Sequence, residues 1–338
     1  MTESPKETMP NLSIVVIGRN EGPRLRRCLE SIRSADYPAD RIELIYVDSG
    51  STDDSLTVAD QLGARTEPIA TGPFSAARAR NVGLRLARHE LLHFFDADTV
   101  VDTHWLRHAV DQMHAHPSVA CVTGIVEEID PRANIYMLVS SFDWHIPPGF
   151  WRMAGGNVLV RADIVRRHGG YDESLVAGEE ADLCYRIRQD GWQILQTGQP
   201  MVRHDLAIQR FRQYWRRIVR TGLSYGMIAL RFRRRPEKMW LRETLLNLTE
   251  VALWIAIVAC AIALRSPAVA LVLPGFIVAR ILWIATRTRI GRRAPRTHCL
   301  TYAAHCQFSR IPLSIGHLLA LKHTWARTQP QLIEYKTP

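Results

Sequence analysis

The sequence predicts an α/β domain with a mostly parallel sheet and flanking helices, followed by a helical region that associates with a membrane. Three observations support this prediction. Strand-like and helix-like segments alternate over the first two hundred of the 338 residues, polar clusters follow the first three strands, and two long apolar stretches lie in the C-terminal half. Strands that alternate with helices at this spacing form βαβ units, which build parallel sheets.

The expected elements follow in chain order from their hydrophobic patterns. A β-branched run at 12–17 predicts the first strand, and an amphipathic stretch at 23–33 predicts the helix after it. The second strand is expected at 42–47, before a helix at about 55–62, and the third at 89–95, after a helix at 76–87. A helix at 105–114, a strand at 118–126 and an aromatic loop at 142–156 continue the chain. We expect the α/β domain to cover residues 1–225.

Acidic side chains follow the second and third strands. Asp48 and Asp53 come after the second strand, and Asp96 and Asp98 come after the third. Ligands of parallel sheets bind beyond the carboxyl ends of the strands, so this edge is the expected site. Two carboxylates one residue apart suit a hard cation, Mg²⁺ or Mn²⁺, that could bridge the oxygens of a diphosphate. Asp48 and Asp53 suit contacts to a ribose or a base, although Asp53 or Asp54 could instead cap the next helix.

A second acidic cluster, formed by Glu179, Glu180 and Asp182, begins a segment with helical spacing. Carboxylates this close repel one another, which raises the pKa of at least one of them and makes it a candidate general base for an alcohol. Acidic residues at a helix start also complement the helix dipole, and this alternative stays open. Arg80 could bind a phosphate through two hydrogen bonds or lie on a solvated helix face. His204 is either a metal ligand or a structural histidine.

Basic charge is concentrated towards the C-terminus. Residues 1–205 carry 21 basic and 29 acidic side chains, whereas residues 206–338 carry 22 basic and 4 acidic. The net charge of +10 therefore does not indicate a nucleic-acid enzyme, because the half with the candidate site is acidic. Apolar stretches within the basic half favour an anionic membrane as its partner. Six scattered cysteines, and a polar N-terminus without a signal-peptide pattern, are typical of a cytosolic protein.

Residues 226–338 are expected to form a membrane-associated region. The stretches 244–264 and 267–286 each contain one charged residue, Glu250 and Arg280, and each has the length that a transmembrane helix needs. Basic runs on both outer flanks predict a hairpin with both ends in the cytoplasm. A re-entrant pair and two buried core helices are the alternatives. Residues 300–326 are expected to form an amphipathic tail, broken at Pro312, along the membrane interface.

Six ordered motifs resemble those of the family 2 glycosyltransferases over residues 11 to about 225. They are Val15 to Glu21, Asp48 to Asp53, Ala79-Arg80-Asn81, Phe95 to Asp98, Gly155-Gly156-Asn157 with Arg161, and Gly178 to Leu183. The resemblance implies a GT-A fold, which is Rossmann-like, and transfer of a sugar with inversion from a nucleotide-diphosphate sugar. It implies that Asp98, Asp96 and His204 bind the metal. The nucleotide-sugar contacts that it implies are Asn20, Glu21, Asp48, Asp53, Arg80, Asp96, Gly156 and Asn157.

The chain departs from the family's pattern at the catalytic base. That base is usually the Asp of a Glu-Asp pair, and the pair here is Glu179-Glu180. The extra methylene moves the carboxylate by about one bond length, a displacement that can be costly in catalysis. Glu180 is the expected base, with Glu179 and Asp182 in reserve. The motif of processive members has only a loose counterpart at 213–217, so we expect one sugar to be transferred per encounter.

The expected protein is a metal-dependent glycosyltransferase anchored in the inner membrane, with its catalytic domain facing the cytoplasm. Its expected donor is a UDP-sugar, and its expected acceptor is a lipid-linked or saccharide hydroxyl in envelope or exopolysaccharide assembly. The alternative is a non-catalytic GT-A-like domain that binds a nucleotide sugar or scaffolds a membrane assembly. The aromatic loop at 142–156 is either a wall that meets the sugar or acceptor, or a packed hydrophobic loop.

Overall fold

Two compact units make up the chain in a computed structural model that describes residues 9–144, 146–292, 294–331 and 333–334. The first unit comprises the described residues of Met1–Ile129, Trp144–Leu175 and Glu179–Asp205. The second comprises Asp130–Asp143, Val176–Gly178 and the described residues from Leu206 onwards. The expected domain boundary at residue 225 therefore falls inside a helix of the second unit.

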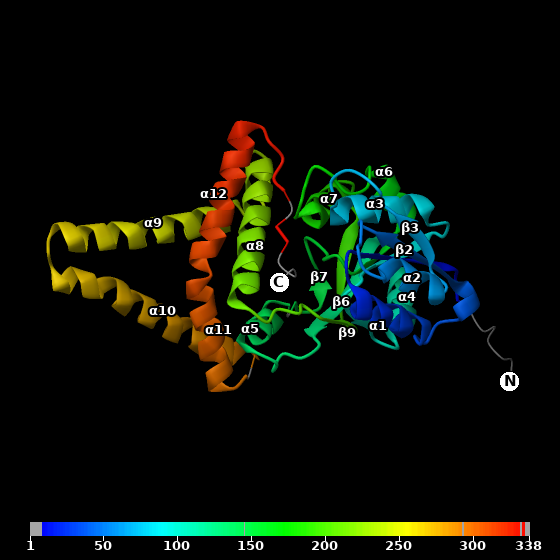
Figure 1. Cartoon of the computed structure of the whole chain (residues 1–338), viewed down its shortest axis with the longest axis horizontal. Helices are drawn as coiled ribbons and strands as arrows, with labels where there is room; N and C mark the ends of the chain where they lie inside the picture. Colours follow the sequence, from blue (N-terminus) through cyan, green and yellow to red (C-terminus); the bar gives the residue numbers. More distant parts are fainter. Residues whose placement is uncertain (1–8, 145, 293, 332, 335–338) are drawn as a thin grey trace. The chain divides into compact units, whose positions relative to one another are not determined.

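A single mixed sheet forms the centre of the first unit (Figure 1). Its strand order is β3-β2-β1-β4-β8-β6-β9-β5, and β7 pairs with β9. Strands β1 to β4 pair in parallel, as the alternation of strands and helices predicts, whereas β8 is antiparallel to both β4 and β6. The bounds are β1 (Leu12–Gly18), β2 (Ile42–Asp48), β3 (Arg65–Pro68), β4 (Leu91–Asp96), β5 (Thr99–Val101), β6 (Val119–Glu128), β7 (Gly149–Phe150), β8 (Val158–Arg161) and β9 (Gln193–His204).

Helices cover both faces of this sheet because alternate residues of the strands are buried on opposite sides. Ile14 and Val16 of β1 belong to the core that includes α1 and α4, whereas Val15 belongs to the core that includes α3, α6 and α7. The helices of this unit are α1 (Gly22–Arg33), η1 (Ala39–Arg41), α2 (Ser55–Gln61), α3 (Ala76–Leu86), α4 (Trp105–Ala115), α6 (Ala162–Arg167) and α7 (Glu179–Gln189). The prediction of an α/β sheet with flanking helices is confirmed.

The described part of the second unit is helical. Its helices are α5 (Ile135–Asp143), α8 (Phe211–Phe232), α9 (Leu241–Ala263), α10 (Pro267–Arg292), α11 (Arg296–Phe308) and α12 (Arg310–Ala326). Helices α8 and α12 pack so closely that a Cβ at Gly222 or Gly316 would lie 2.2 or 2.3 Å from a carbonyl oxygen of the other helix. The expected amphipathic tail forms two helices that meet at Ser309, and Pro312 lies in the first turn of α12, where proline is tolerated.

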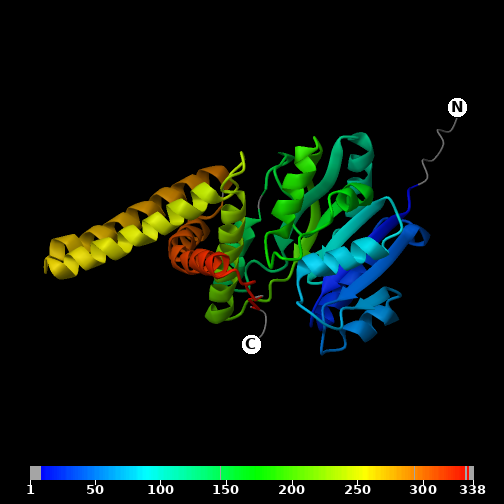
Figure 2. The same ribbon diagram turned by 90° about the horizontal axis from the view of Figure 1, so that it is seen from above.

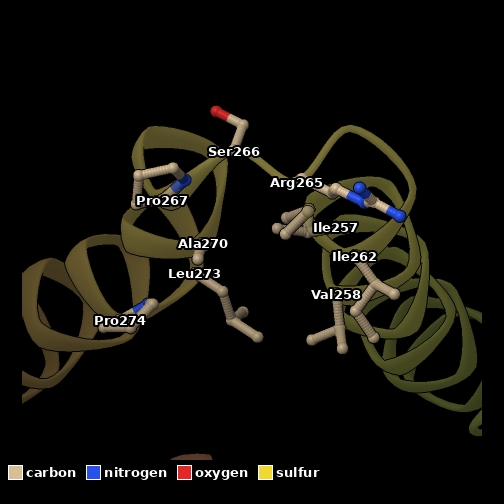
Figure 3. Close-up of a pocket in the computed structure, with 10 residues that line it drawn as sticks. Ile257, Val258, Ile262, Arg265, Ser266, Pro267, Ala270, Leu273 and Pro274 are labelled. Atoms are coloured by element: carbon tan, nitrogen blue, oxygen red, sulfur yellow. The ribbon is translucent and has the colours of Figure 1, made fainter.

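Helices α9 and α10 form a hairpin that extends away from α8 and α12 (Figures 1 and 2). Both are long and apolar enough to cross a membrane by length and composition, and most of their apolar side chains are exposed. At the turn, Arg265-Ser266, an open apolar groove of about 550 Å³ separates the helix ends (Figure 3). Between α9 and α10, Arg280 Nη1 lies 3.3 Å from Glu250 Oε2, so the charged residues of the two apolar stretches 244–264 and 267–286 pair with each other.

Candidate active site

The carboxyl ends of β1, β2 and β4 lie at one edge of the sheet. Gly18 pairs with Asp48, and Ile17 pairs with Asp96, so the polar segments that follow these strands are neighbours. Strand β8 runs in the opposite direction and begins at the same edge. Just before it, the side-chain oxygen of Asn157 accepts a hydrogen bond from the backbone N–H of Asp96 at 3.0 Å. Segments separated by more than a hundred residues therefore meet where parallel sheets bind ligands.

Hydrogen bonds connect the segments that follow β1 and β2. The side-chain oxygen of Asn20, a residue with a φ of 55°, accepts from the N–H of Thr52 at 2.7 Å, and its own N–H donates to Ser51 Oγ at 2.8 Å. The buried carboxylate of Asp48 accepts from the N–H of Ser51 at 2.8 Å and from the hydroxyl of Tyr46 at 3.0 Å. These bonds fix the orientation of Asp48 before any ligand arrives.

Glu21 and Asp53 also make contacts within this edge. Glu21 is buried and its Oε2 lies 2.6 Å from Arg24 Nε. Asp53 Oδ1 accepts from the N–H of Ser55 at 3.1 Å, and Asp54 occupies the N-cap of α2 without a side-chain capping bond. The contacts of Asn20, Glu21, Asp48 and Asp53 with a nucleotide stay predictions.

Asp96, Asp98 and His204 form a cluster in which one ligand atom from each lies within 4.8 Å of the others. The N–H of Asp205 donates to the carbonyl of Asp98 at 2.8 Å, which ties the end of β9 to the turn after β4. Consequently His204 Nε2 lies 3.3 Å from Asp98 Oδ1, and the ring of Trp144 lies 5.0 Å from the imidazole. Two carboxylates and an imidazole are a donor set that fits Mn²⁺ or Mg²⁺.

Arg80 is buried between this cluster and α7, with 2% of its side chain exposed. Its Nη2 lies 2.9 Å from Asp96 Oδ1. Its Nη1 lies 2.9 Å from Glu179 Oε1 and 3.3 Å from Glu180 Oε1. Burial alone would lower the pKa of Arg80, but the three carboxylates raise it above its ordinary value. The alternative of a solvated helix-face arginine is therefore wrong.

Gly156 is adjacent to this ion-pair cluster and leaves space for it. A Cβ at position 156 would lie 2.1 Å from Arg80 Nη2 and 3.0 Å from Asp96 Oδ2. At the preceding residue, Gly155, a Cβ would meet nothing within 4 Å. The two adjacent glycines therefore differ in function: only Gly156 allows the guanidinium to reach Asp96.

The acidic residues at the start of α7 lie in three different environments. Glu179 is buried, with 5% of its side chain exposed, and Asp182 pairs with Arg186 Nε at 2.9 Å. Glu180 is the most accessible of the three, with 21% of its side chain exposed. Burial raises the pKa of Glu180 to about 7, Glu179 adds to this effect, and Arg80 opposes it. A carboxyl group with this pKa can accept a proton from an alcohol near neutral pH.

The aromatic loop at 142–156 divides between the two units. Phe142 belongs to the second unit, Trp144 belongs to the first, and residue 145 lies outside the described residues. Phe150 and Trp151 have exposed fractions of 58% and 40%. Since these two aromatic rings are accessible, a contact with sugar or acceptor stays a prediction for this segment.

Of two aromatic residues at the site, Trp144 lies in the loop predicted at 142–156, whereas Tyr171 escaped sequence reasoning. Trp144 contacts His204, and Tyr171 places its ring 5.5 Å from the guanidinium of Arg80. Asn81, the residue after Arg80, holds Tyr171 by accepting from its N–H and donating to its carbonyl, each at 2.8 Å. The Arg80-Asn81 motif was the available signal, but its partner ninety residues away was not visible in the sequence.

Residues 13–160 match the family model described as Glycosyl transferase family 2. The pre-mycofactocin glycosyltransferase of Mycobacterium tuberculosis is 28% identical over 239 residues, which cover 65% of this chain and 48% of that protein. The beta-monoglucosyldiacylglycerol synthase of Nostoc sp. is 24% identical over 257 residues, which cover 69% of this chain and 54% of that protein. The chain thus spans about half the length of these relatives.

A solved structure shares the fold over most of the chain. It is a mannosyltransferase from Pyrobaculum calidifontis in complex with GDP-Man and Mn²⁺. The two are 21% identical, the match covers 94% of this chain and 91% of that chain, and the TM-score is 0.63. This likeness confirms the prediction of a GT-A fold.

Proposed function

Residues 13–160 form a family 2 glycosyltransferase domain, and from this premise we propose that the protein transfers a sugar from a nucleotide-diphosphate sugar to an acceptor hydroxyl, with inversion. The observation that carries the proposal is the convergence of two chemical groups at one sheet edge. One group is the donor set for a divalent cation, in which Asp96 contacts Arg80. The other is the carboxyl group of Glu180, which has a raised pKa and also contacts Arg80.

The donor diphosphate is proposed to bind beside Asp98, Asp96 and His204. Mg²⁺ or Mn²⁺ held by these residues would neutralise negative charge on the departing nucleoside diphosphate. The segments with Asn20, Asp48 and Asp53 would hold the nucleoside, because they lie beside the metal cluster at the same sheet edge. UDP is the nucleotide we expect, and GDP is the second one to test because the mannosyltransferase neighbour binds GDP-Man.

Glu180 is proposed as the general base. Its carboxylate takes the proton of the acceptor hydroxyl while that oxygen bonds to C1 of the sugar. The bond from C1 to the diphosphate oxygen breaks on the opposite face, so the nucleoside diphosphate leaves and the configuration at C1 inverts. Glu179 and Asp182 are weaker candidates, because one is almost fully buried against Arg80 and the other is paired with Arg186.

Calorimetric titration with UDP and with GDP, each with and without Mn²⁺, tests the donor site. We expect metal-dependent binding of one nucleotide, loss of that binding in Asp98→Asn, and wild-type binding in Glu90→Gln, a matched change of an exposed carboxylate. Removal of Mn²⁺ with a chelator should likewise abolish sugar transfer. Binding that ignores both metal and mutation would contradict the metal mechanism.

Turnover of Glu180 variants tests the base and separates an enzyme from a scaffold. Glu180→Gln should lose transfer by about 10²–10⁴-fold, the usual contribution of a general base, and Glu180→Asp should retain part of it. Nucleotide binding should be unchanged in both variants. A protein that binds nucleotide but transfers no sugar in any form would instead be the non-catalytic alternative.

Membrane attachment through the α9–α10 hairpin, at the inner membrane with the catalytic domain in the cytoplasm, is the second part of the proposal. The helices have 23 and 26 residues, or about 35 and 39 Å at 1.5 Å per residue, against a hydrocarbon core of about 30 Å. Basic residues flank both outer ends, as the positive-inside rule requires of cytoplasmic ends. Pairing of Glu250 with Arg280 lowers the cost of both charges near the membrane.

A lipid-linked acceptor follows from this attachment, because a chain held at the bilayer meets lipid-borne hydroxyls at high effective concentration. The name of the Nostoc relative, a glucosyldiacylglycerol synthase, supports a lipid acceptor. Transfer to extracted membrane lipids, compared with soluble saccharides, tests this part. Labelling of Ser266→Cys in a Cys260→Ser background by an impermeant maleimide tests the hairpin: a spanning hairpin is labelled only from the extracytoplasmic side, and a re-entrant one is not labelled from that side.

A further inference from the structure

Arg80 joins two parts of the candidate site that come from distant segments of the chain. Asp96 ends β4, whereas Glu179 and Glu180 begin α7, and they lie 16, 99 and 100 residues from Arg80. One guanidinium contacts a carboxylate oxygen of each of them at 2.9 to 3.3 Å. Arg80 therefore links the metal cluster directly to the proposed base.

The chemistry of the guanidinium group makes this link rigid. It is planar, and its two terminal nitrogens keep a fixed separation, so contacts to Nη1 and to Nη2 determine the relative position of the groups they bind. An ammonium group at the same position would keep the positive charge but could not contact Asp96 and Glu179 in this geometry. A lysine at this position therefore separates the contribution of the positive charge from that of the planar guanidinium geometry.

The surroundings of Arg80 hold the guanidinium in one place. The missing side chain of Gly156 leaves just enough space for Nη2. The ring of Tyr171 lies 5.5 Å from the guanidinium carbon, and Asn81 anchors the backbone of Tyr171 through two hydrogen bonds. A side chain that is 2% exposed between these groups has no room to turn towards solvent.

We propose that Arg80 is a positioning residue that holds the Glu180 carboxylate at a fixed distance from the Asp96–Asp98 turn. The contact to Glu180 Oε1 is specific to the longer side chain at this position, because a shorter aspartate would withdraw its oxygen by about one bond length from Nη1. Arg80 would thereby place the carboxylate of a glutamate where the family's pattern has an aspartate. This inference rests on the proposed glycosyl transfer.

A positioning role and a phosphate-binding role make different predictions. A residue that binds the donor phosphate contributes to nucleotide affinity, whereas a residue that acts through Glu180 and Asp96 contributes to turnover and to the order of α7. The arrangement favours positioning, because both terminal nitrogens already contact carboxylates of the protein.

The test compares Arg80→Lys and Arg80→Met with Arg85→Met, which removes an exposed arginine of the same helix. The full chain in detergent is assayed for three quantities: nucleoside-diphosphate Kd with Mn²⁺, kcat at saturating donor, and hydrogen–deuterium exchange of the first turn of α7. Arg80→Lys keeps the charge, so it serves as the folded variant if Arg80→Met, which leaves three carboxylates without a cation, does not fold.

We expect Arg80→Lys to lower kcat by about 10²-fold, to change the nucleotide Kd by less than about threefold, and to speed exchange in α7. Arg85→Met should match the wild type in all three. An Arg80→Lys variant with wild-type kcat and exchange overturns the proposal. An Arg80→Lys variant that loses nucleotide affinity but keeps the wild-type kcat and exchange also overturns the proposal, because Arg80 would then act as a ligand of the donor phosphate. If the wild type transfers no sugar, the proposed function fails, and the exchange of α7 still decides whether Arg80 orders it.

Discussion

A methyl group at position 156 is expected to disable the site while leaving the fold intact. The Cβ of an alanine there would lie 2.1 Å from Arg80 Nη2, whereas ordinary contacts begin at 3.4 Å. The guanidinium must therefore move by about 1.3 Å, the difference between 3.4 and 2.1 Å. Gly156 does not have a positive φ, so the alanine adds no backbone strain.

That displacement should reach the chemistry through the contacts of Arg80. A shift of about 1 Å at a catalytic site can lower turnover by about 10²-fold, which corresponds to about 2.7 kcal/mol in the activation free energy. Gly155→Ala is the matched control, since a Cβ there meets nothing within 4 Å. We expect kcat of Gly156→Ala to fall by this amount and kcat of Gly155→Ala to stay near the wild-type value.

The assay is release of nucleoside diphosphate at saturating donor, acceptor and Mn²⁺, with the midpoint of thermal unfolding measured for each variant. Near-wild-type turnover in Gly156→Ala would refute the role assigned to the Arg80 contacts. An equal loss in both alanine variants would refute the steric reasoning, because only one of them meets the guanidinium.

Three further predictions concern the pH dependence of turnover, the ion pair between Glu250 and Arg280, and the packing of the second unit. Glu180 accepts a proton only when it is ionised, and its pKa is raised to about 7. The value of kcat should therefore fall about tenfold per pH unit below 7 and level off above it. A flat profile of kcat from about pH 5.5 to 8.5 would contradict this. Glu250→Gln removes the carboxylate that pairs with Arg280 at 3.3 Å and with Arg310 at 3.6 Å, and it should lower the free energy of unfolding in detergent by about 1–2 kcal/mol. The double variant with Arg280→Gln should recover part of that loss, because one of the two arginines no longer needs the carboxylate. Gly316→Ala places a Cβ 2.3 Å from a backbone oxygen of α8 and should lower the free energy of unfolding by about 1–3 kcal/mol, measured by thermal unfolding. Gly275→Ala is the control and should leave this free energy unchanged, because its Cβ meets nothing within 4 Å.

The local elements and the edge of the sheet that carries the site were predictable from the sequence. The runs at 12–17, 42–47 and 89–95 correspond to β1, β2 and β4, because hydrophobic periodicity reports which residues are buried within one element. Asp48 and Asp96 end two of these strands, and parallel strands bring such ends together. The apolar hairpin was also visible, since its signal is the length of two apolar runs that each contain a single charged residue.

Contacts between distant segments were decided by the tertiary structure alone. Nothing in the sequence near Arg80 indicates that its partners include glutamates 99 and 100 residues away. Likewise, the pattern of strands and helices did not reveal that β8 enters the sheet antiparallel to β4 and β6, which brings Gly156 and Asn157 beside Asp96. Periodicity determines which face of an element is buried, but the partner of a buried charge depends on how separate elements pack. The position of Glu180 relative to the metal cluster is therefore a property of the fold, although each residue that creates it is present in a recognisable motif.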